Sequence, residues 1–168
     1  MIFAGFDPAG RTGWAVGDCA GNEPLAGFWD LPELNDRARP RALASLYSAA
    51  IAVIRHHKVT LAAIEHPLHI GSAHGDEGLT MLSGAIQAAA VNGGAQIVMV
   101  YPATWRKVFL GVAYPEEPKD ECLARCRLHR WAIEDHNAGD AAGIWFWARR
   151  KYGGRSAQIG EHLMGAVL

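Results

Sequence analysis

The first part of the chain alternates between short apolar runs and turns, a pattern typical of β-strands. Three such runs cover Ile2–Asp7, Thr12–Asp18 and Leu25–Leu31. They are separated by a Pro-Ala-Gly-Arg segment and by a Gly-Asn-Glu-Pro segment. These turn residues supply the permissive or fixed backbone angles that tight strand connections need. The pattern therefore predicts an antiparallel meander.

The period of the apolar positions then changes. From Arg39 to Lys58 apolar residues recur every three or four positions, which predicts a helix with one apolar stripe. The rest of the chain divides into a strand at Leu61–Ile64 that ends in Glu65, a polar loop at Leu68–Gly78, a buried helix at Leu79–Val91, a strand at Ala95–Tyr101, a short helix or turn at Thr104–Leu110, and helices at Lys119–Trp131 and Asn137–Tyr152. Trp145 and Trp147 on the last helix are interpreted as core residues.

Three sequential strands followed by alternating helices and strands predict an α/β fold. We expect a mixed five-stranded sheet, with three antiparallel strands and then parallel strands, and helices on both faces. This is the RNase H-like architecture, although element order alone leaves other α/β arrangements open. The 168 residues fit one domain, expected at residues 1–153. Residues 154–168 are expected to be a C-terminal tail with an apolar anchor at its end.

Composition adds little that is decisive. Half of the residues are hydrophobic and a fifth are charged, as in ordinary globular proteins. There is no apolar run of about 20 residues for a membrane span, and the first residues do not resemble a secretory signal. We therefore expect a cytoplasmic protein with no membrane partner. The net charge of −1 counts mildly against DNA binding, but basic residues are clustered at 37–41, 106–107, 125–130 and 149–151.

The three cysteines do not form a disulfide framework. Cys122 and Cys126 are four residues apart on an expected helix, and His129 follows three residues later. This spacing leaves a metal site open, but no second close pair completes a zinc site, so ordinary helix packing is favoured.

Three acids stand at the ends of expected elements. Asp7 ends the first strand, Glu65 ends the fourth, and Asp140 lies in the first turn of the last helix, three residues after Asn137. Ligand sites gather at strand ends in α/β sheets, and oxygen ligands suit Mg²⁺ or Mn²⁺. Each acid alone has an ordinary alternative as a turn cap, a salt bridge or a helix N-terminal residue. Together they favour a metal-binding site.

Four segments, GFDPAGRTGWAV, LAAIEH, YPATWRKVFLG and DHNAGDAAGIW, resemble the RuvC-like Holliday junction resolvases of the RNase H-like superfamily, including phage and prophage members. The resemblance implies a divalent-metal-dependent endonuclease that cuts branched DNA, with two Mg²⁺ or Mn²⁺ ions at Asp7, Glu65, Asn137 and Asp140. Asn137 stands where the family has His or Asp. It is expected either to bind metal through its carbonyl oxygen or to cap the last helix.

The resemblance also implies substrate contacts. Arg106, Lys107 and Lys119 match basic positions that contact scissile-strand phosphates, with solvated surface residues as the alternative. The loop after Glu65 offers Leu68 and Ile70 where the family places an apolar wedge at the junction. One of His66, His69 and His74 is a candidate general base, although such histidines are more often loop or packing residues.

Because a four-way junction is two-fold symmetric, the resemblance implies a homodimer. The helix at Leu79–Val91 is a candidate dimer surface, with burial in the monomer as the alternative. Two other functions remain open. One is a non-catalytic nucleic-acid-binding or regulatory protein of the same fold, and the other is an actin-like phosphotransferase, which would need a second such domain.

Overall fold

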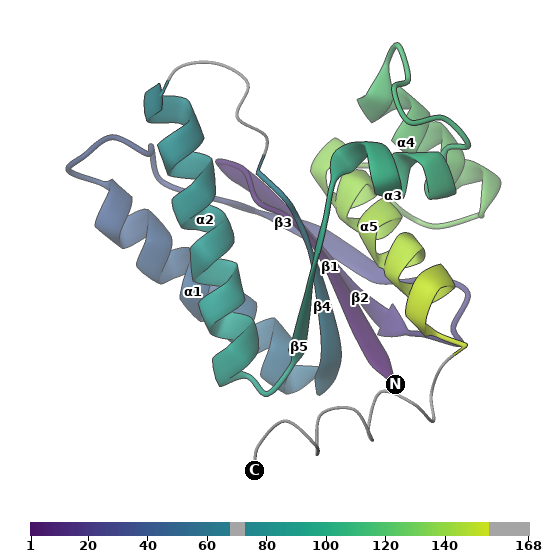
Figure 1. Cartoon of the computed structure of the whole chain (residues 1–168), viewed down its shortest axis with the longest axis horizontal. Helices are drawn as coiled ribbons and strands as arrows, with labels where there is room; N and C mark the ends of the chain where they lie inside the picture. Colours follow the sequence, from purple (N-terminus) through teal and green to yellow (C-terminus); the bar gives the residue numbers. More distant parts are fainter. Residues whose placement is uncertain (68–72, 155–168) are drawn as a thin grey trace.

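The computed structural model describes residues 1–67 and 73–154, which form a five-stranded sheet covered by helices on both faces (Figure 1). The strands are β1 (Ile2–Asp7), β2 (Arg11–Asp18), β3 (Leu25–Asp30), β4 (Val59–Glu65) and β5 (Gln96–Val100), in the order β3-β2-β1-β4-β5. β1, β2 and β3 pair antiparallel, whereas β4 pairs parallel to β1 and β5 pairs parallel to β4. The sheet predicted from the sequence is confirmed.

The helices form two layers, one on each face of the sheet (Figure 1). Helices α1 (Arg39–His56) and α2 (Ala73–Asn92) cover one face and pack against each other. Helices α3 (Pro102–Phe109), α4 (Pro118–Leu128) and α5 (His136–Tyr152) cover the other, where α5 contacts β1 and β2. Among the described residues, no helix is long and apolar enough to cross a membrane.

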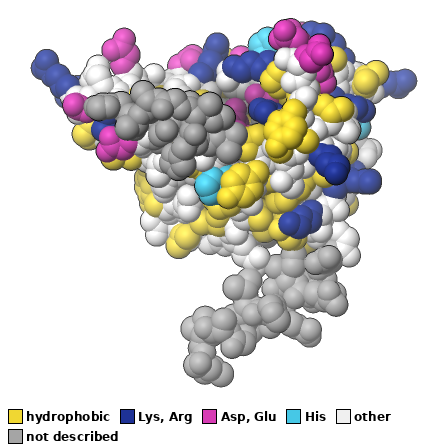
Figure 2. All heavy atoms as spheres, turned by 45° about the horizontal axis from the view of Figure 1, so that its top comes forward, with side chains coloured by type: hydrophobic (Ala, Val, Ile, Leu, Met, Phe, Trp, Pro, Cys, Tyr) yellow, Lys and Arg dark blue, Asp and Glu magenta, His cyan; other side chains and the backbone are white. Residues whose placement is uncertain are grey.

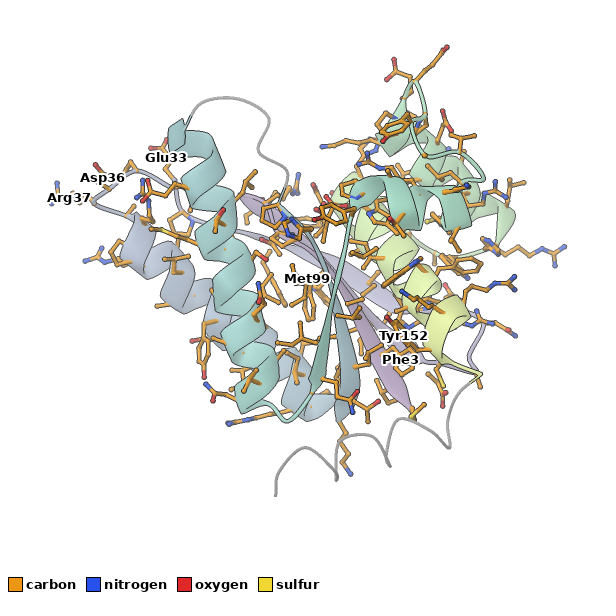
Figure 3. The ribbon with its side chains drawn as sticks, in the orientation of Figure 1. Phe3, Glu33, Asp36, Arg37, Met99 and Tyr152 are labelled. Carbon is orange, nitrogen blue, oxygen red and sulfur yellow. The ribbon has the colours of Figure 1, made fainter. Side chains whose placement is uncertain are left out.

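Alternation along the strands sends side chains into two separate cores. On β1, Phe3 belongs to the core under α5, whereas Ala4 and Phe6 belong to the core under α1 and α2. Figure 3 shows Phe3 under α5 and Met99 of β5 directed toward the α1 and α2 layer. Trp145 and Trp147 are buried in the α5 core, as predicted.

Two expected boundaries are wrong. The segment predicted as a loop up to Gly78 is helical from Ala73 onward, because its polar His, Gly, Asp and Glu residues hide the helical period. The helix predicted to reach Trp131 ends at Leu128, and Arg130 then adopts a left-handed backbone conformation with φ of 61°. The expected tail with its apolar anchor lies beyond Gly154, outside the described residues.

Candidate active site

Asp7 and Glu65 are brought together by the pairing of two parallel strands. Phe6 of β1 pairs with Ile64 of β4, so that the next residue of each strand is the carboxylate. Parallel neighbours are about 4.8 Å apart, and paired positions face the same side of the sheet. The two acids therefore leave the same edge of the sheet side by side, and both side chains are half-buried.

Asp140 reaches the same edge because α5 lies directly on the backbone of β1 and β2. A β-carbon at Gly5 would lie 2.4 Å from the Ala141 carbonyl oxygen, and one at Gly13 only 2.0 Å from that of Asn137. Gly13 is the pairing partner of Asp7. The missing side chains thus let the first turn of α5 approach the end of β1, which places Asp140 next to Asp7.

The turn after Asp7 is held by Thr12, which is fully buried. Its hydroxyl donates a hydrogen bond of 2.6 Å to the Ala9 carbonyl and lies 3.4 Å from the Ala9 amide nitrogen. A side chain that bonds the backbone in this way fixes a tight turn. Thr12 thus fixes the backbone that leaves Asp7.

The three carboxylates interact electrostatically. Burial raises the pKa of Asp7 well above its ordinary range, and the charges of Glu65 and Asp140 raise it further. Burial likewise raises the pKa of Glu65 to about 7 and raises that of Asp140. Carboxyl groups that oppose one another's ionisation in this way mark a site that favours a cation.

Glu65 is oriented by a tryptophan. The indole Nε1 of Trp105, a buried residue of α3, donates a hydrogen bond of 2.5 Å to Glu65 Oε2. This donor favours the ionised form and lowers the pKa of Glu65 against the effect of burial. A buried indole needs a partner for its N–H, so Trp105 and Glu65 fix each other.

The structure brings two of the three predicted cations to the carboxylates. Arg106 lowers the pKa of all three acids, and Lys119 lowers the pKa of Asp7 and Asp140. Arg106 Nε is buried without a hydrogen-bond partner. Lys107 follows Arg106 on α3 but is exposed and is not among the main charges acting on these acids.

Asn137 is not the helix cap. That role belongs to Asp135, whose Oδ1 accepts hydrogen bonds from the backbone N–H groups of Asn137 and Ala138. The capping alternative for Asn137 is therefore wrong, because α5 begins one residue earlier than expected. The Asn137 side-chain amide lies 3.4 Å from the same Asp135 oxygen, and its role as a metal ligand stays a prediction.

The donor set fits a hard divalent cation. Asp140 is only 6% exposed, and its Oδ1 is buried without a hydrogen-bond partner. Such an atom is costly unless a cation or a donor compensates it. Among the residues whose side chains are described, 1–67 and 77–154, no group of three His, Cys, Asp or Glu side chains forms a ready-made ion site.

A pocket of about 300 Å³ opens beside the carboxylates. Its walls come from both faces of the sheet and are Pro8, Glu65, His66, Pro67, Leu79, Pro102 and Arg106. The pocket thus combines an apolar wall with the side chains of Glu65, His66 and Arg106. Figure 2 turns the carboxyl ends of the strands toward the reader, and there basic side chains gather beside exposed hydrophobic ones. The basic cluster around Arg37 lies elsewhere, at the start of α1 (Figure 3).

The remaining candidate residues lie in the segment with the two cysteines and in the loop after Glu65. Cys122 and Cys126 are buried in the core, and His129 stacks on Phe109 and Trp131, so the packing interpretation of this segment is confirmed over the zinc site. Leu68, His69 and Ile70 lie outside the described residues, as does the side chain of His74. His66 is described, and its ring stacks on Tyr101.

Three residues of the site were missed in the sequence. Thr12 and Trp105 support the acids through hydrogen bonds to the Ala9 backbone and to Glu65, and Asp135 supports them by capping α5. The Asp135 cap was detectable, because an Asp before an apolar helix is a common N-cap. Nothing in the local sequence indicates that Trp105 reaches Glu65, since that contact depends on the docking of α3.

The structural class of the chain is the RNase H-like fold, in the form seen in RuvC structures. Thermus thermophilus RuvC superposes with a TM-score of 0.75 at 16% identity, covering 92% of this chain and 97% of that one. T. thermophilus RuvC in complex with Holliday junction substrate gives 0.73, also at 16%, covering 91% and 94%. The yeast mitochondrial Holliday junction resolvase Ydc2 gives 0.59 at 10%, covering 95% and 83%.

A particular relative is also similar in sequence. The crossover junction endodeoxyribonuclease RuvC of Zymomonas mobilis is 26% identical over 147 residues, which cover 86% of this chain and 87% of that protein. No family model matches the chain. The resemblance to the RuvC-like proteins predicted from the sequence is confirmed.

Proposed function

We propose that the chain is a divalent-metal-dependent endonuclease that cuts four-way DNA junctions. The observation that carries this proposal is the convergence of Asp7, Glu65 and Asp140 at one sheet edge, where each resists ionisation without a cation. The relatives with this fold are named as junction resolvases or bind junction substrate. Site and fold therefore support the same substrate class.

Asp7, Glu65 and Asp140 would hold the ions, with Asn137 as a fourth, neutral oxygen donor. Mg²⁺ or Mn²⁺, in a pair, would supply Lewis-acid polarisation of the phosphate and activation of a water molecule. Hydrolysis forms a bond from the water oxygen to phosphorus and breaks the bond to the 3′ oxygen. The products are a 5′-phosphate and a 3′-hydroxyl.

The side chains around the three acids orient the carboxylates and offset negative charge. Trp105 holds the Glu65 carboxylate through its indole N–H. Arg106 and Lys119 act on the charges of the site and would stabilise the negative charge that develops on the phosphate. Lys107 is exposed one position further along α3 and would contact a neighbouring phosphate. Leu68 keeps its proposed role as a wedge, outside the described residues.

A resolvase working on a two-fold symmetric junction needs two sites, so we also propose a homodimer. Helix α2 offers the surface. Met81, Gly84, Ala88 and Val91 are exposed at helical spacing on one side of α2, whereas Leu82 and Ile86 are buried in the core. The two alternatives for this helix, a dimer surface and burial in the monomer, thus apply to different faces of α2.

The test uses a labelled four-way junction, a plain duplex and an RNA–DNA hybrid, each in Mg²⁺ and in Mn²⁺. We expect cutting of the junction, and a loss of about a hundredfold or more in Asp7→Asn, because a group that holds the cation is removed. The matched control is Asp18→Asn, which changes a strand-end aspartate at the opposite end of the sheet, paired with Ile2. It is expected to cut normally.

Three outcomes would contradict the proposal. If no substrate is cut, the chain is not a nuclease. If Asp7→Asn cuts as fast as the unaltered protein, the site is assigned to the wrong residues. Hydrolysis of ATP without nucleic acid would favour the phosphotransferase alternative.

A non-catalytic DNA-binding protein is the second candidate. The neutral Asn137 and the net charge of −1 favour it. Junction binding without cutting in either metal, unchanged by Asp7→Asn, would support it.

A further inference from the structure

Two aromatic rings stand side by side at the mouth of the pocket. His66 is the first residue after β4, and Tyr101 is the first residue after β5. Glu65 and Val100, the residues before them, are paired across the two parallel strands. The rings stack with centroids 4.6 Å apart and planes inclined by 22°. This separation matches the spacing of neighbouring strands, so the sheet itself sets the stack.

The pair is held rigidly. The His66 backbone N–H donates a hydrogen bond of 2.8 Å to the Val100 carbonyl, which continues the strand pairing by one residue. The His66 Nδ1 lies 3.0 Å from the Pro67 carbonyl oxygen. Because a carbonyl only accepts, Nδ1 carries the proton and donates. Pro67 and Pro102 follow the two rings and fix the backbone after each of them.

The pair is also accessible and next to the chemistry. Tyr101 is 55% exposed, which is unusual for a large aromatic residue in this chain. His66 lines the same pocket as Glu65 and Arg106. An exposed, preorganised aromatic surface beside a basic side chain is the composition of a single-strand nucleotide site.

We propose that His66 and Tyr101 form a stacking platform for the base of the nucleotide next to the scissile phosphate. This inference rests on the proposed function and extends it from the phosphate to the neighbouring base. The phosphate lies against Arg106 and the carboxylates, and the base lies against the rings. At a junction crossover the strands leave their duplex stack, so a base is free to take such a place.

The pocket size agrees with one nucleotide. Its volume of about 300 Å³ stands at the lower end for small-ligand pockets. Leu79 and three prolines supply an apolar wall, and no hydrogen-bonding side chain faces this wall apart from Glu65, His66 and Arg106 among its described lining residues. Stacking tolerates any base, so the platform would position a strand without reading its sequence.

The experiment measures the stacking of the base through its fluorescence. A four-way junction carries 2-aminopurine on one or the other side of the mapped cut site, and binds protein in an Asp7→Asn background so that it stays intact. We expect a fluorescence change at one of these positions only. Tyr101→Phe keeps the ring and the signal. Tyr101→Ala loses the signal and weakens junction binding by roughly 5- to 150-fold.

Matched variants separate stacking from folding. Tyr101 caps no helix through its side chain, so Tyr101→Ala is expected to melt as the unaltered protein does. His66→Phe, which keeps an aromatic ring, is expected to retain the signal. Tyr114→Ala removes a tyrosine that is 86% exposed in the connection between α3 and α4, and it is expected to leave the signal unchanged.

The outcomes distinguish the two proposals. If the unaltered protein cuts junctions, but Tyr101→Ala binds them with the same affinity and the same fluorescence, only the platform is overturned. If the unaltered protein neither binds nor cuts any junction, the proposed function falls, and the platform with it. An equal loss of signal in Tyr114→Ala would also overturn the platform, because it would show a general effect of exposed tyrosines.

Discussion

The Glu65 carboxyl group has a measurable effect on stability. Burial raises its pKa from an ordinary 4.5 to about 7, so the folded protein holds a proton that the unfolded chain has already released between these values. The free energy of unfolding of the metal-free protein therefore falls as the pH rises from about 4.5 to 7. Divalent cation restores stability above that window, because it binds only the folded, ionised site.

We expect Glu65→Gln to be more stable than the unaltered protein at pH 8 without metal, and to lose this advantage at pH 5. The measurement is denaturant unfolding in chelator at both pH values. Glu134→Gln, which changes an exposed glutamate, serves as the control and is expected to show no such difference. An advantage for Glu65→Gln that is equal at both pH values would contradict the role of ionisation.

The indole of Trp105 lowers the pKa of the same carboxyl group. Trp105→Phe removes the hydrogen bond to Glu65, which raises the pKa of Glu65 further, because that bond favours the charged form. The acidic limb of the pH–rate profile is expected to move to higher pH, and the free energy of unfolding to fall by on the order of 1–3 kcal/mol.

Trp131→Phe provides the comparison for Trp105. Trp131 is also buried, and its indole donates a 2.7 Å hydrogen bond to the Asn22 carbonyl, away from the acids. A similar loss of stability is expected, with an unchanged pH–rate profile. If both variants shift the profile equally, the effect belongs to packing and not to the hydrogen bond.

Among the elements, α5 is constrained in position by its close approach to the backbone of β1 and β2. Gly5→Ala would place a methyl group 2.4 Å from the Ala141 carbonyl oxygen and 2.5 Å from the Trp145 nitrogen. Both atoms are backbone, so the helix itself must move. We expect a loss of about 2–4 kcal/mol in the free energy of unfolding, measured by chemical denaturation, and slower cutting in the fraction that folds.

Gly84→Ala is the matched control on α2, where a β-carbon would meet nothing within 4 Å. It removes a glycine from the interior of a helix, so a gain of roughly 0.5–1 kcal/mol is expected. A change of less than about 0.5 kcal/mol in Gly5→Ala, no larger than an ordinary surface substitution gives, would contradict the close approach of α5 to β1.

At this scale the sequence predicted most of the architecture. The alternation of apolar residues and the turns between them located all five strands within about two residues. The start of α2 at Ala73 could not be predicted from the sequence, because the first turns of this helix are as polar as a loop. The three acids were found because they end strands or begin a helix. Their supports, Thr12 and Trp105, act across the fold, so local patterns do not indicate them.

The whole molecule is expected to work as a pair. Ala88→Glu places a charge in the exposed apolar stripe of α2 and is expected to convert a dimer to a monomer, because an unpaired charge in an apolar interface is costly. Light scattering after gel filtration measures the mass. The monomer is expected to nick one strand of a junction where the dimer cuts two.

Ala124→Glu makes the same change on an exposed position of α4 and is expected to stay dimeric. A monomeric unaltered protein that still cuts both strands would contradict the dimer. A dimer in all three proteins would place the interface elsewhere.

The order of the acids along the chain also has a consequence for synthesis on the ribosome. Asp7 and Glu65 emerge early, whereas Asp140 lies on α5, the last helix of the described chain. A growing chain can form β1, β2 and β4 before α5 is made, but the backbone at Gly5 and Gly13 then has nothing packed against it. The third carboxylate arrives together with the helix that covers these glycines. If the proposed function holds, DNA cutting is expected only once α5 has folded onto the sheet, and chains that lack α5 are expected to leave DNA intact.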